Sequence, residues 1–222
     1  MPNKQTILIA GATGNVGGGA AVALAHRGAR VVLLGRTLEK LKTRAESIRK
    51  SMIEKQDGQQ DIDVSTLVVD FSDLESVRSA AEEALDRFPA IHGLVLSAVA
   101  LAQGGPNILA NGHELMFATN VLGPFLFAEL LLERLQASDG LILHVINTSN
   151  REIKWNDLES IENHKTTVAY ERTKVMHRII AGEMARRYPD RISSLAFNPT
   201  FIIDKKDPEL EKRWPSGFLG FF

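Results

Sequence analysis

Residues 11–17 read Gly11-Ala12-Thr13-Gly14-Asn15-Val16-Gly17 and lie between an apolar run, 6–10, and a segment of helical periodicity. Glycines at such a turn let the backbone fold tightly and approach a pyrophosphate closely. The first amides of the following helix, at the positive end of its dipole, would then face the anion. The stretch therefore predicts a nucleotide-binding turn rather than a plain strand-to-helix connection. Its expected cofactor contacts are Gly11, Thr13, Gly14, Asn15, Val16 and Gly17.

Apolar runs rich in β-branched residues alternate with helical segments on both sides of this turn, a pattern typical of βαβ units. The strands are predicted over 6–10, 30–34, 64–69, 92–97, 141–146 and 192–197. The helices are predicted over 16–27, 38–55, 74–87, 112–135 and 168–188. Whether the fourth helix breaks at Gly123-Pro124 is left open. The pattern predicts an α/β fold, a doubly wound parallel sheet with helices on both faces, in a single domain over 1–222.

Local signals refine these boundaries. Ser72 or Asp73 suits the N-cap of the third helix, and Gly28 suits the C′ position of the first. The polar segment 54–63 is expected to be a surface loop. Residues 200–222 are few for the further helix and strand that such sheets usually add, so we expect a short or truncated C-terminal part, with an incomplete substrate lid. We expect four apolar residues there to be disordered or buried against a second subunit: Phe218, Leu219, Phe221 and Phe222.

Composition excludes several classes of protein. The 222 residues include no cysteine, which rules out disulfides, thiolate nucleophiles and zinc-thiolate sites. With 26 basic and 27 acidic residues and a net charge of -1, the chain offers no basic field for nucleic acid or anionic lipid. No apolar stretch is long enough to span a membrane, and no signal peptide is evident, so a cytoplasmic location is expected. His144, His164 and His177 are interpreted as core or surface residues, and no metal site is expected.

The end of the second predicted strand indicates which cofactor fits. An NAD site usually has an acidic residue there to bind the ribose 2′-hydroxyl, but this chain has Arg36. A guanidinium can bind a 2′-phosphate with two hydrogen bonds. The position favours NADP over NAD, the alternative being a solvated arginine at a strand end. Asp70, after the third strand, is expected either to meet the adenine or to cap the next helix.

Tyr170 and Lys174 lie four residues apart and therefore on one face of the last predicted helix. An ammonium close to a phenol stabilises the phenolate, so we expect Lys174 to lower the pKa of Tyr170. Tyr170 could then exchange a proton with a substrate oxygen.

Short polar side chains follow the fifth predicted strand, at the sheet edge where ligands of such folds bind: Asn147, Thr148, Ser149 and Asn150. A hydroxyl in this group could donate to a substrate carbonyl. Asn120, in an otherwise apolar stretch, either holds a water that relays protons from Lys174 or is a satisfied helix residue.

Taken together, these segments resemble the short-chain dehydrogenase/reductase superfamily from Thr6 to about Ile203. The resemblance rests on the glycine turn, Asp70, Asn120-Val121-Leu122-Gly123 as the family's Asn-x-x-Gly, and Tyr170-Glu171-Arg172-Thr173-Lys174 as its Tyr-x-x-x-Lys. It implies a Rossmann fold and hydride transfer between a nicotinamide and a carbonyl or alcohol carbon. The catalytic residues that it implies are Tyr170, Lys174, Ser149 and Asn120. It adds cofactor contacts from Asp70, Phe71, Ala98, Lys174 and Pro199.

Several positions depart from the family pattern. The glycines are spaced GxxGxxG rather than GxxxGxG, Leu96-Ser97-Ala98-Val99 replaces Asn-Asn-Ala-Gly, and Asn198-Pro199-Thr200 replaces Pro-Gly. An ungapped match puts Asn147 at the serine position, whereas one or two extra residues put Thr148 or Ser149 there; Ser149 is preferred. The long stretch before Tyr170, with Trp155, resembles the retinol-dehydrogenase-like branch and points to an apolar substrate.

The leading hypothesis is an NADPH-dependent oxidoreductase that transfers a hydride between the nicotinamide and a carbonyl or alcohol carbon of a small apolar substrate. Tyr170 is its expected general acid/base, acting as the acid in carbonyl reduction, and a homodimer or homotetramer is expected. The alternative is an NADP(H)-binding regulator or scaffold with little or no turnover, which the departures from the family pattern would explain.

Overall fold

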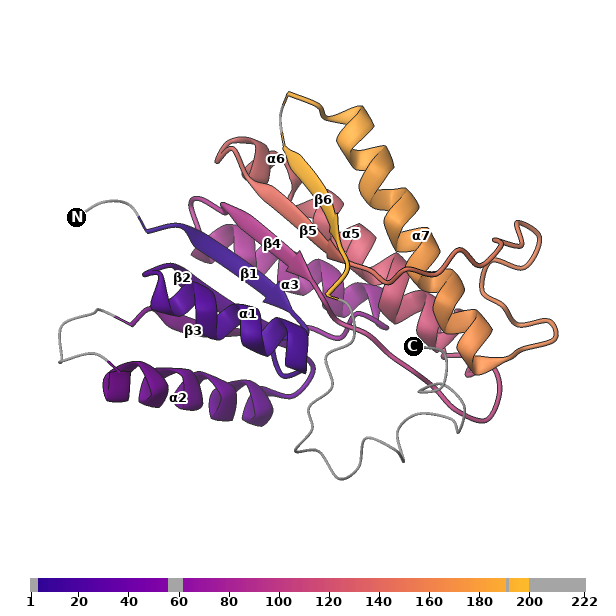
Figure 1. The fold of residues 1–222 in the computed structure, drawn as a ribbon, viewed down its shortest axis with the longest axis horizontal. Coiled ribbons are helices and arrows are strands. Elements are labelled where there is room, and N and C mark those ends of the chain that lie inside the picture. Colours follow the sequence, from indigo (N-terminus) through magenta and orange to yellow (C-terminus); the bar gives the residue numbers. More distant parts are fainter. Residues whose placement is uncertain (1–3, 56–61, 191, 200–222) are drawn as a thin grey trace.

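The computed structural model describes residues 4–55, 62–190 and 192–199. Its centre is a six-stranded, wholly parallel sheet in the order β3-β2-β1-β4-β5-β6 (Figure 1). The strands are β1 (Thr6–Ala10), β2 (Arg30–Gly35), β3 (Val64–Val68), β4 (Gly93–Leu96), β5 (Leu141–Val145) and β6 (Ser193–Phe197). The helices are α1 (Asn15–His26), α2 (Leu38–Lys55), α3 (Leu74–Arg87), α4 (Leu115–Phe117), the π-helix η1 (Ala118–Leu122), α5 (Gly123–Leu130), α6 (Leu132–Gln136) and α7 (Thr166–Arg187). The doubly wound α/β fold is confirmed.

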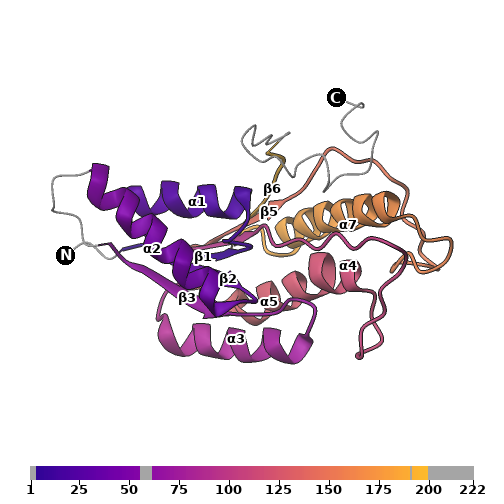
Figure 2. The same cartoon turned by 90° about the horizontal axis from the view of Figure 1, so that it is seen from below.

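Two apolar layers enclose the sheet. The first packs α1 and α2 against one face, through residues such as Ala21, Ala25, Leu41 and Ile48. The second packs α3 and α5, with Met184 of α7, against the other face. Figure 2 shows α1 on one side of the sheet and α3, α5 and α7 on the other. Every residue of β1 and β4 is buried because helices cover both faces, which explains why these strands are continuous apolar runs.

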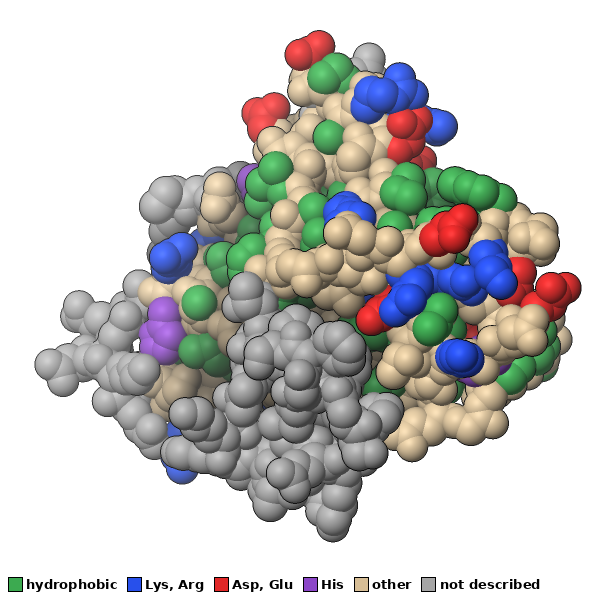
Figure 3. Space-filling view, turned by 45° about the vertical axis from the view of Figure 1, so that its right-hand side comes forward, with side chains coloured by type: hydrophobic (Ala, Val, Ile, Leu, Met, Phe, Trp, Pro, Cys, Tyr) green, Lys and Arg blue, Asp and Glu red, His purple; other side chains and the backbone are tan. Residues whose placement is uncertain are grey.

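Charges remain interspersed on the surface. Figure 3 shows acidic and basic side chains standing beside one another on the face in view. None of the helices in the described ranges is long and apolar enough to cross a membrane. Within the same residues, no three His, Asp or Glu side chains gather as a set of metal ligands.

The predicted boundaries of α2 and α3 are confirmed, and the other elements agree within a few residues except one. Asp73 is the N-cap of α3, where its side chain accepts from the Glu75 amide, and Gly28 has φ +82° after α1. The helix predicted over 112–135 instead begins at Leu115 and passes through η1 before α5. A π turn accommodates an extra residue, which a regular apolar period does not reveal.

The junction of η1 and α5 lies against the turn after β3. A Cβ atom built on Gly123 would lie 2.1 Å from the carbonyl oxygen of Phe71, a separation that real Cβ atoms do not show. The Phe71 ring packs edge-to-face on Phe127 with centroids 5.7 Å apart, so this backbone cannot move away freely. The contact therefore requires glycine at position 123.

The outer edge of the sheet is less covered. Leu195 and Phe197 of β6 are 51% and 46% exposed, and they pair in register with Leu143 and Val145 of β5. The expectations for the C-terminal apolar cluster, Phe218, Leu219, Phe221 and Phe222, lie outside the described residues.

Replacing Gly123 with alanine is expected to lower the free energy of unfolding by about 2–3 kcal/mol, because the Phe71 backbone or that of α5 must shift. Gly19→Ala is the matched control. Gly19 lies in α1 with no heavy atom within 4 Å of an added Cβ, so alanine should stabilise the chain by up to about 1 kcal/mol. Urea unfolding of both variants measures the difference; equal effects would contradict the Gly123 contact.

Candidate active site

The glycine turn after β1 closes onto the end of β4. Gly11 has φ +75°, and a Cβ on it would lie 2.7 Å from the Ala98 amide nitrogen. A Cβ on Gly17 would lie 2.5 Å from the Gly11 oxygen and 2.6 Å from the Ser97 Oγ. Ser97 Oγ in turn donates to the Ala10 carbonyl at 2.5 Å. Gly11 and Gly17 are therefore required by close packing inside the turn.

The outer side of the turn is open to a ligand. Thr13, Gly14 and Asn15 are exposed, and Gly14 is the N-cap of α1, so no side chain caps the first amides of the helix. The first turn of α1 has no acidic residue that would repel an anion. These residues fit the pyrophosphate of a dinucleotide, as the sequence predicted for the turn.

The other predicted cofactor contacts lie around this turn and differ in their exposure and hydrogen bonding. Arg36 is exposed just beyond β2, and Ala98 is half-buried beside Gly11. Asp70 Oδ1 accepts from the Ser72 amide at 2.9 Å and from the Ser72 hydroxyl at 2.7 Å. Asp70 therefore holds its own turn, and the helix-cap alternative was wrong for Asp70 because Asp73 caps α3. Contact of Asp70 with the adenine stays a prediction.

Two further cofactor predictions have less support from side-chain position. The Phe71 side chain is buried in the core against Phe127, so only its backbone could reach a cofactor. Pro199 is half-buried two residues beyond β6, at the carboxyl end of the sheet.

Tyr170 and Lys174 lie together on α7. The Lys174 Nζ is 5.8 Å from the centroid of the Tyr170 ring, and it donates to the Val145 carbonyl at the end of β5, at 3.0 Å. Lys174 is 5% exposed. The predicted juxtaposition is confirmed, and it lies where the carboxyl end of β5 meets α7.

The electrostatics of the pair differ from the prediction. Burial raises the pKa of Tyr170 to about 12, and burial lowers the pKa of Lys174 to about 8. The expected lowering of the Tyr170 pKa by the ammonium was wrong for this structure, because burial disfavours the charged phenolate. At neutral pH the phenol is therefore protonated and suited to donate a proton.

Asn120 ties the π-helix to this pair. Its Oδ1 accepts from the Ala100 amide at 2.6 Å, and its Nδ2 donates to the Ala100 carbonyl at 2.9 Å and to Thr173 Oγ1 at 3.2 Å. Thr173 Oγ1 donates to the Tyr170 carbonyl at 2.7 Å. The Asn120 side chain is thus a satisfied helix residue, and it links the loop after β4 to α7.

Ser149 lies on the loop after β5, beside a different face of α7. Its amide donates to Asn147 Oδ1 at 3.0 Å, and its Oγ accepts from the Arg151 amide at 3.2 Å. It lines a cavity of about 530 Å³ with Asn150, Arg151, Glu152, Val168, Glu171 and Arg172. Tyr170 and Lys174 do not line that cavity, so the choice among Ser149, Thr148 and Asn147 stays a prediction.

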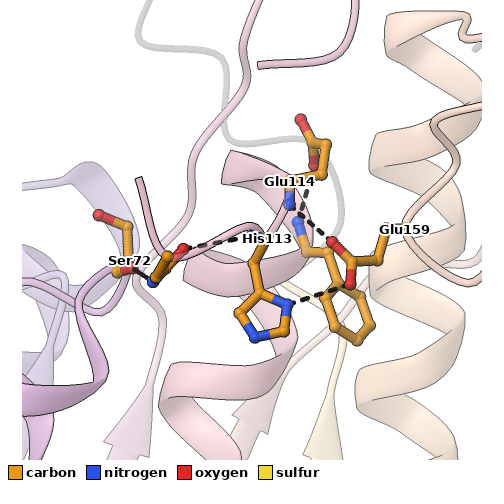
Figure 4. Close-up of polar contacts among 6 residues, drawn as sticks. Ser72, His113, Glu114 and Glu159 are labelled. Atoms are coloured by element: carbon orange, nitrogen blue, oxygen red, sulfur yellow. Dashed lines mark hydrogen bonds and ion pairs between the residues drawn. The ribbon is translucent and has the colours of Figure 1, made fainter. Parts of the chain in front are cut away.

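A polar clasp joins the two loops that flank this region (Figure 4). The Glu159 carboxylate, before α7, accepts a hydrogen bond from the Glu114 amide at 2.6 Å, and its other oxygen lies 3.1 Å from His113 Nδ1. The Glu114 side chain accepts from the Phe117 amide at 3.0 Å and caps α4. The loop before α7 is thereby fixed to the start of the segment that carries Asn120.

Two buried histidines lie beside Lys174. The rings of His144 on β5 and His177 on α7 meet edge-to-face with centroids 4.9 Å apart. Ser194 Oγ donates to the Ala181 carbonyl at 2.9 Å and lies 3.3 Å from His144 Nε2. Burial lowers the pKa of His144 to about 4, and burial together with His144 and Lys174 lowers the pKa of His177. The interpretation of both as core residues is confirmed.

Sequence reasoning missed three supporting side chains. Ser97 closes the glycine turn, Thr173 joins Asn120 to Tyr170, and the buried Arg172 holds the loop before α7 through Glu152 and Ser160. The three-residue spacing from Tyr170 could have indicated Thr173, since residues three apart lie on the same side of a helix. Nothing local distinguishes Arg172 from a surface arginine.

Comparisons with known proteins agree with this geometry. A family model described as short chain dehydrogenase matches residues 5–153, more than half of the chain. The chain therefore belongs to the short chain dehydrogenase family, whose members are oxidoreductases. This confirms the predicted family resemblance.

Two relatives illustrate its breadth. The chain is 31% identical over 197 residues to a proposed daunorubicin C-13 ketoreductase of Streptomyces sp. (strain C5), covering 88% of this chain and 65% of that protein. It is 29% identical over 211 residues to mouse retinol dehydrogenase 12, covering 92% of this chain and 63% of that protein. The chain thus spans less than two thirds of the length of these curated relatives.

Solved structures share the fold. A Mycobacterium paratuberculosis protein is 25% identical, with a TM-score of 0.74 over 89% of this chain and 69% of that chain. A Shigella flexneri protein crystallised with NADP is 24% identical, with a TM-score of 0.69 over 89% of this chain and 77% of that chain.

The buried histidine pair makes the free energy of unfolding depend on pH below about 6.5. Above about pH 6.5, histidine is neutral in both the folded and the unfolded chain. As the pH falls from 6.5 to about 4, the unfolded chain binds protons that folded His144 refuses, so the free energy of unfolding decreases, by about 3 kcal/mol for this residue. Urea unfolding at several pH values should show that decrease. His144→Asn should reduce it, and an unchanged slope in that variant would contradict the assignment.

Proposed function

We propose that the chain is an NADPH-dependent oxidoreductase that reduces the carbonyl group of a small apolar substrate. The observation that carries the proposal is the juxtaposition of Tyr170 with the buried Lys174 at the carboxyl end of β5, in a chain that has an open glycine turn after β1. Bound NADPH would supply a hydride to the substrate carbon. The chain's own residues would bind the cofactor, orient the carbonyl and supply the proton.

Tyr170 is the proposed general acid. With a pKa raised to about 12, the phenol keeps its proton at neutral pH and can donate it to the oxygen on which negative charge develops. This protonation state supports reduction over oxidation as the working direction at neutral pH. Lys174 would bring a positive charge to the site and, in the predicted role, bind the nicotinamide ribose. Ser149 is the proposed carbonyl-orienting hydroxyl.

NADP is favoured over NAD by Arg36. The residue is exposed immediately after β2, where a carboxylate would otherwise bind the ribose 2′-hydroxyl and repel a 2′-phosphate. A guanidinium there suits the phosphate geometry.

An apolar substrate is supported by the loop between β5 and α7. Trp155 is 74% exposed, and Leu158 and Ile161 on the same loop are also exposed. The Glu159 clasp and Arg172 hold that loop in place. Fixed apolar side chains near a catalytic helix suit a hydrophobic ketone or aldehyde. The relatives named for retinol and for daunorubicin support the same substrate class. Their names do not favour the regulator or scaffold alternative.

Tyr170→Phe tests the proposed acid. The variant lacks the donating hydroxyl, so NADPH oxidation with a panel of apolar aldehydes and ketones should slow by roughly 10²–10⁴-fold. Tyr188→Phe, which alters the only other tyrosine in the sequence, is the control and should react at the wild-type rate. Equal rates for Tyr170→Phe and the wild-type chain would eliminate Tyr170 as the acid.

The rate is also expected to depend on the charge of Lys174. Because its folded pKa is about 8, the ammonium is present below that pH and is lost above it. The kcat/KM for reduction should therefore decline above about pH 8. Lys174→Met should be slow at every pH and lack this decline. A wild-type profile that stays level to pH 10 would contradict a role for the ammonium.

A further inference from the structure

Arg44, on the second turn of α2, lies across the glycine turn. Its Nη2 donates to the Thr13 carbonyl at 3.3 Å, and its Cζ would be 3.1 Å from a Cβ placed on Gly18. The bare backbone of Gly18 in α1 is therefore what lets the guanidinium lie against the turn. Thr13 itself is exposed, so this contact is at the surface where a ligand would approach.

The same turn lies beside the end of β2. The amides of Gly11 and Ala12 donate to the Leu34 carbonyl at 3.2 and 3.4 Å, two residues before Arg36. Arg36 thus follows the strand that adjoins the turn, while Arg44 reaches the turn from α2. The Arg44 guanidinium therefore contacts the turn from α2, and Arg36 is an exposed residue just beyond the strand that pairs with β1.

Within the described part of the chain, no carboxylate forms an ion pair with Arg44. Its guanidinium donates instead to a neutral backbone carbonyl, that of Thr13. The first turn of α1 contributes no acidic residue, and the amides there carry partial positive charge. A guanidinium with one hydrogen bond to a carbonyl still has donors for an anion.

We propose that Arg44 is a specificity-determining residue that binds the adenosine 2′-phosphate of NADPH together with Arg36. The proposal rests on the proposed NADPH-dependent function and extends it to a residue outside the recognised motifs. Arg36, just after β2, and Arg44, on α2, would each supply N–H donors to the phosphate oxygens. NADH lacks this phosphate and gains nothing from Arg44.

The test compares NADPH and NADH binding by cofactor fluorescence for the wild-type chain, Arg44→Gln and Lys42→Gln. Lys42→Gln is the matched control, because it removes the same charge from the same helix. Lys42 lines a different region, a cavity beside Val64, Ser65 and Thr66 of β3. We expect Arg44→Gln to weaken NADPH binding by about tenfold, as for loss of a charge-assisted hydrogen bond. NADH binding should change less than about twofold, as should NADPH binding to Lys42→Gln.

A lower dependence of NADPH binding on salt in Arg44→Gln would support the same assignment. Thermal unfolding of each variant distinguishes lost affinity from lost folding, and Arg44→Lys, which keeps the charge, should recover part of the NADPH affinity. Equal losses for NADPH and NADH, or for Arg44→Gln and Lys42→Gln, would overturn the inference and leave the proposed function standing. Failure of the wild-type chain to bind either cofactor would overturn both.

Discussion

The hydrogen bond from the buried Lys174 ammonium to the Val145 carbonyl is the interaction on which the proposed site depends. It fixes α7 to the carboxyl end of β5. Tyr170, one helical turn before Lys174 on α7, therefore lies beside the ammonium. Removing an ammonium from water is costly, and a single carbonyl compensates only in part, which is why the Lys174 pKa falls. The same burial keeps the Tyr170 phenol protonated. The tendency of Tyr170 to donate a proton therefore results from its burial, and not from attraction between its hydroxyl and Lys174.

The neighbouring elements hold this pair from three directions. Asn120 connects the loop after β4 to α7 through Thr173, and the buried His144–His177 pair fills the core beside Lys174 without adding a charge at neutral pH. The Glu159 clasp fixes the loop that leads into α7. The glycine turn lies at the same carboxyl edge of the sheet, because all six strands are parallel and end together there.

Local sequence patterns were sufficient for most of the fold. The bounds of β1 were predicted correctly because the strand is buried on both faces. The bounds of α2 and α3 were predicted correctly from helical periodicity, and in α3 the Asp73 cap marks the same start. The π-helix around Asn120 was not predictable, because an inserted residue leaves the apolar pattern intact and depends on tertiary contacts such as Asn120 with Ala100. In the site, helical spacing predicts that Tyr170 and Lys174 lie on one face of α7, as the structure has them. The sign of the Tyr170 pKa shift cannot be predicted in this way, because it depends on burial that spacing cannot show. Arg44 was missed for a related reason, since its role depends on packing between α1 and α2.

Transfer of the hydride from NADPH to a substrate carbon can be followed with an isotope label. The chain is mixed with NADPH deuterated at the transferable C4 position and an apolar ketone, and the product is examined by mass spectrometry and NMR. We expect one deuterium per product molecule, on the new carbinol carbon. Tight NADPH binding without deuterium in any product across a broad panel of carbonyl compounds would contradict the proposed function.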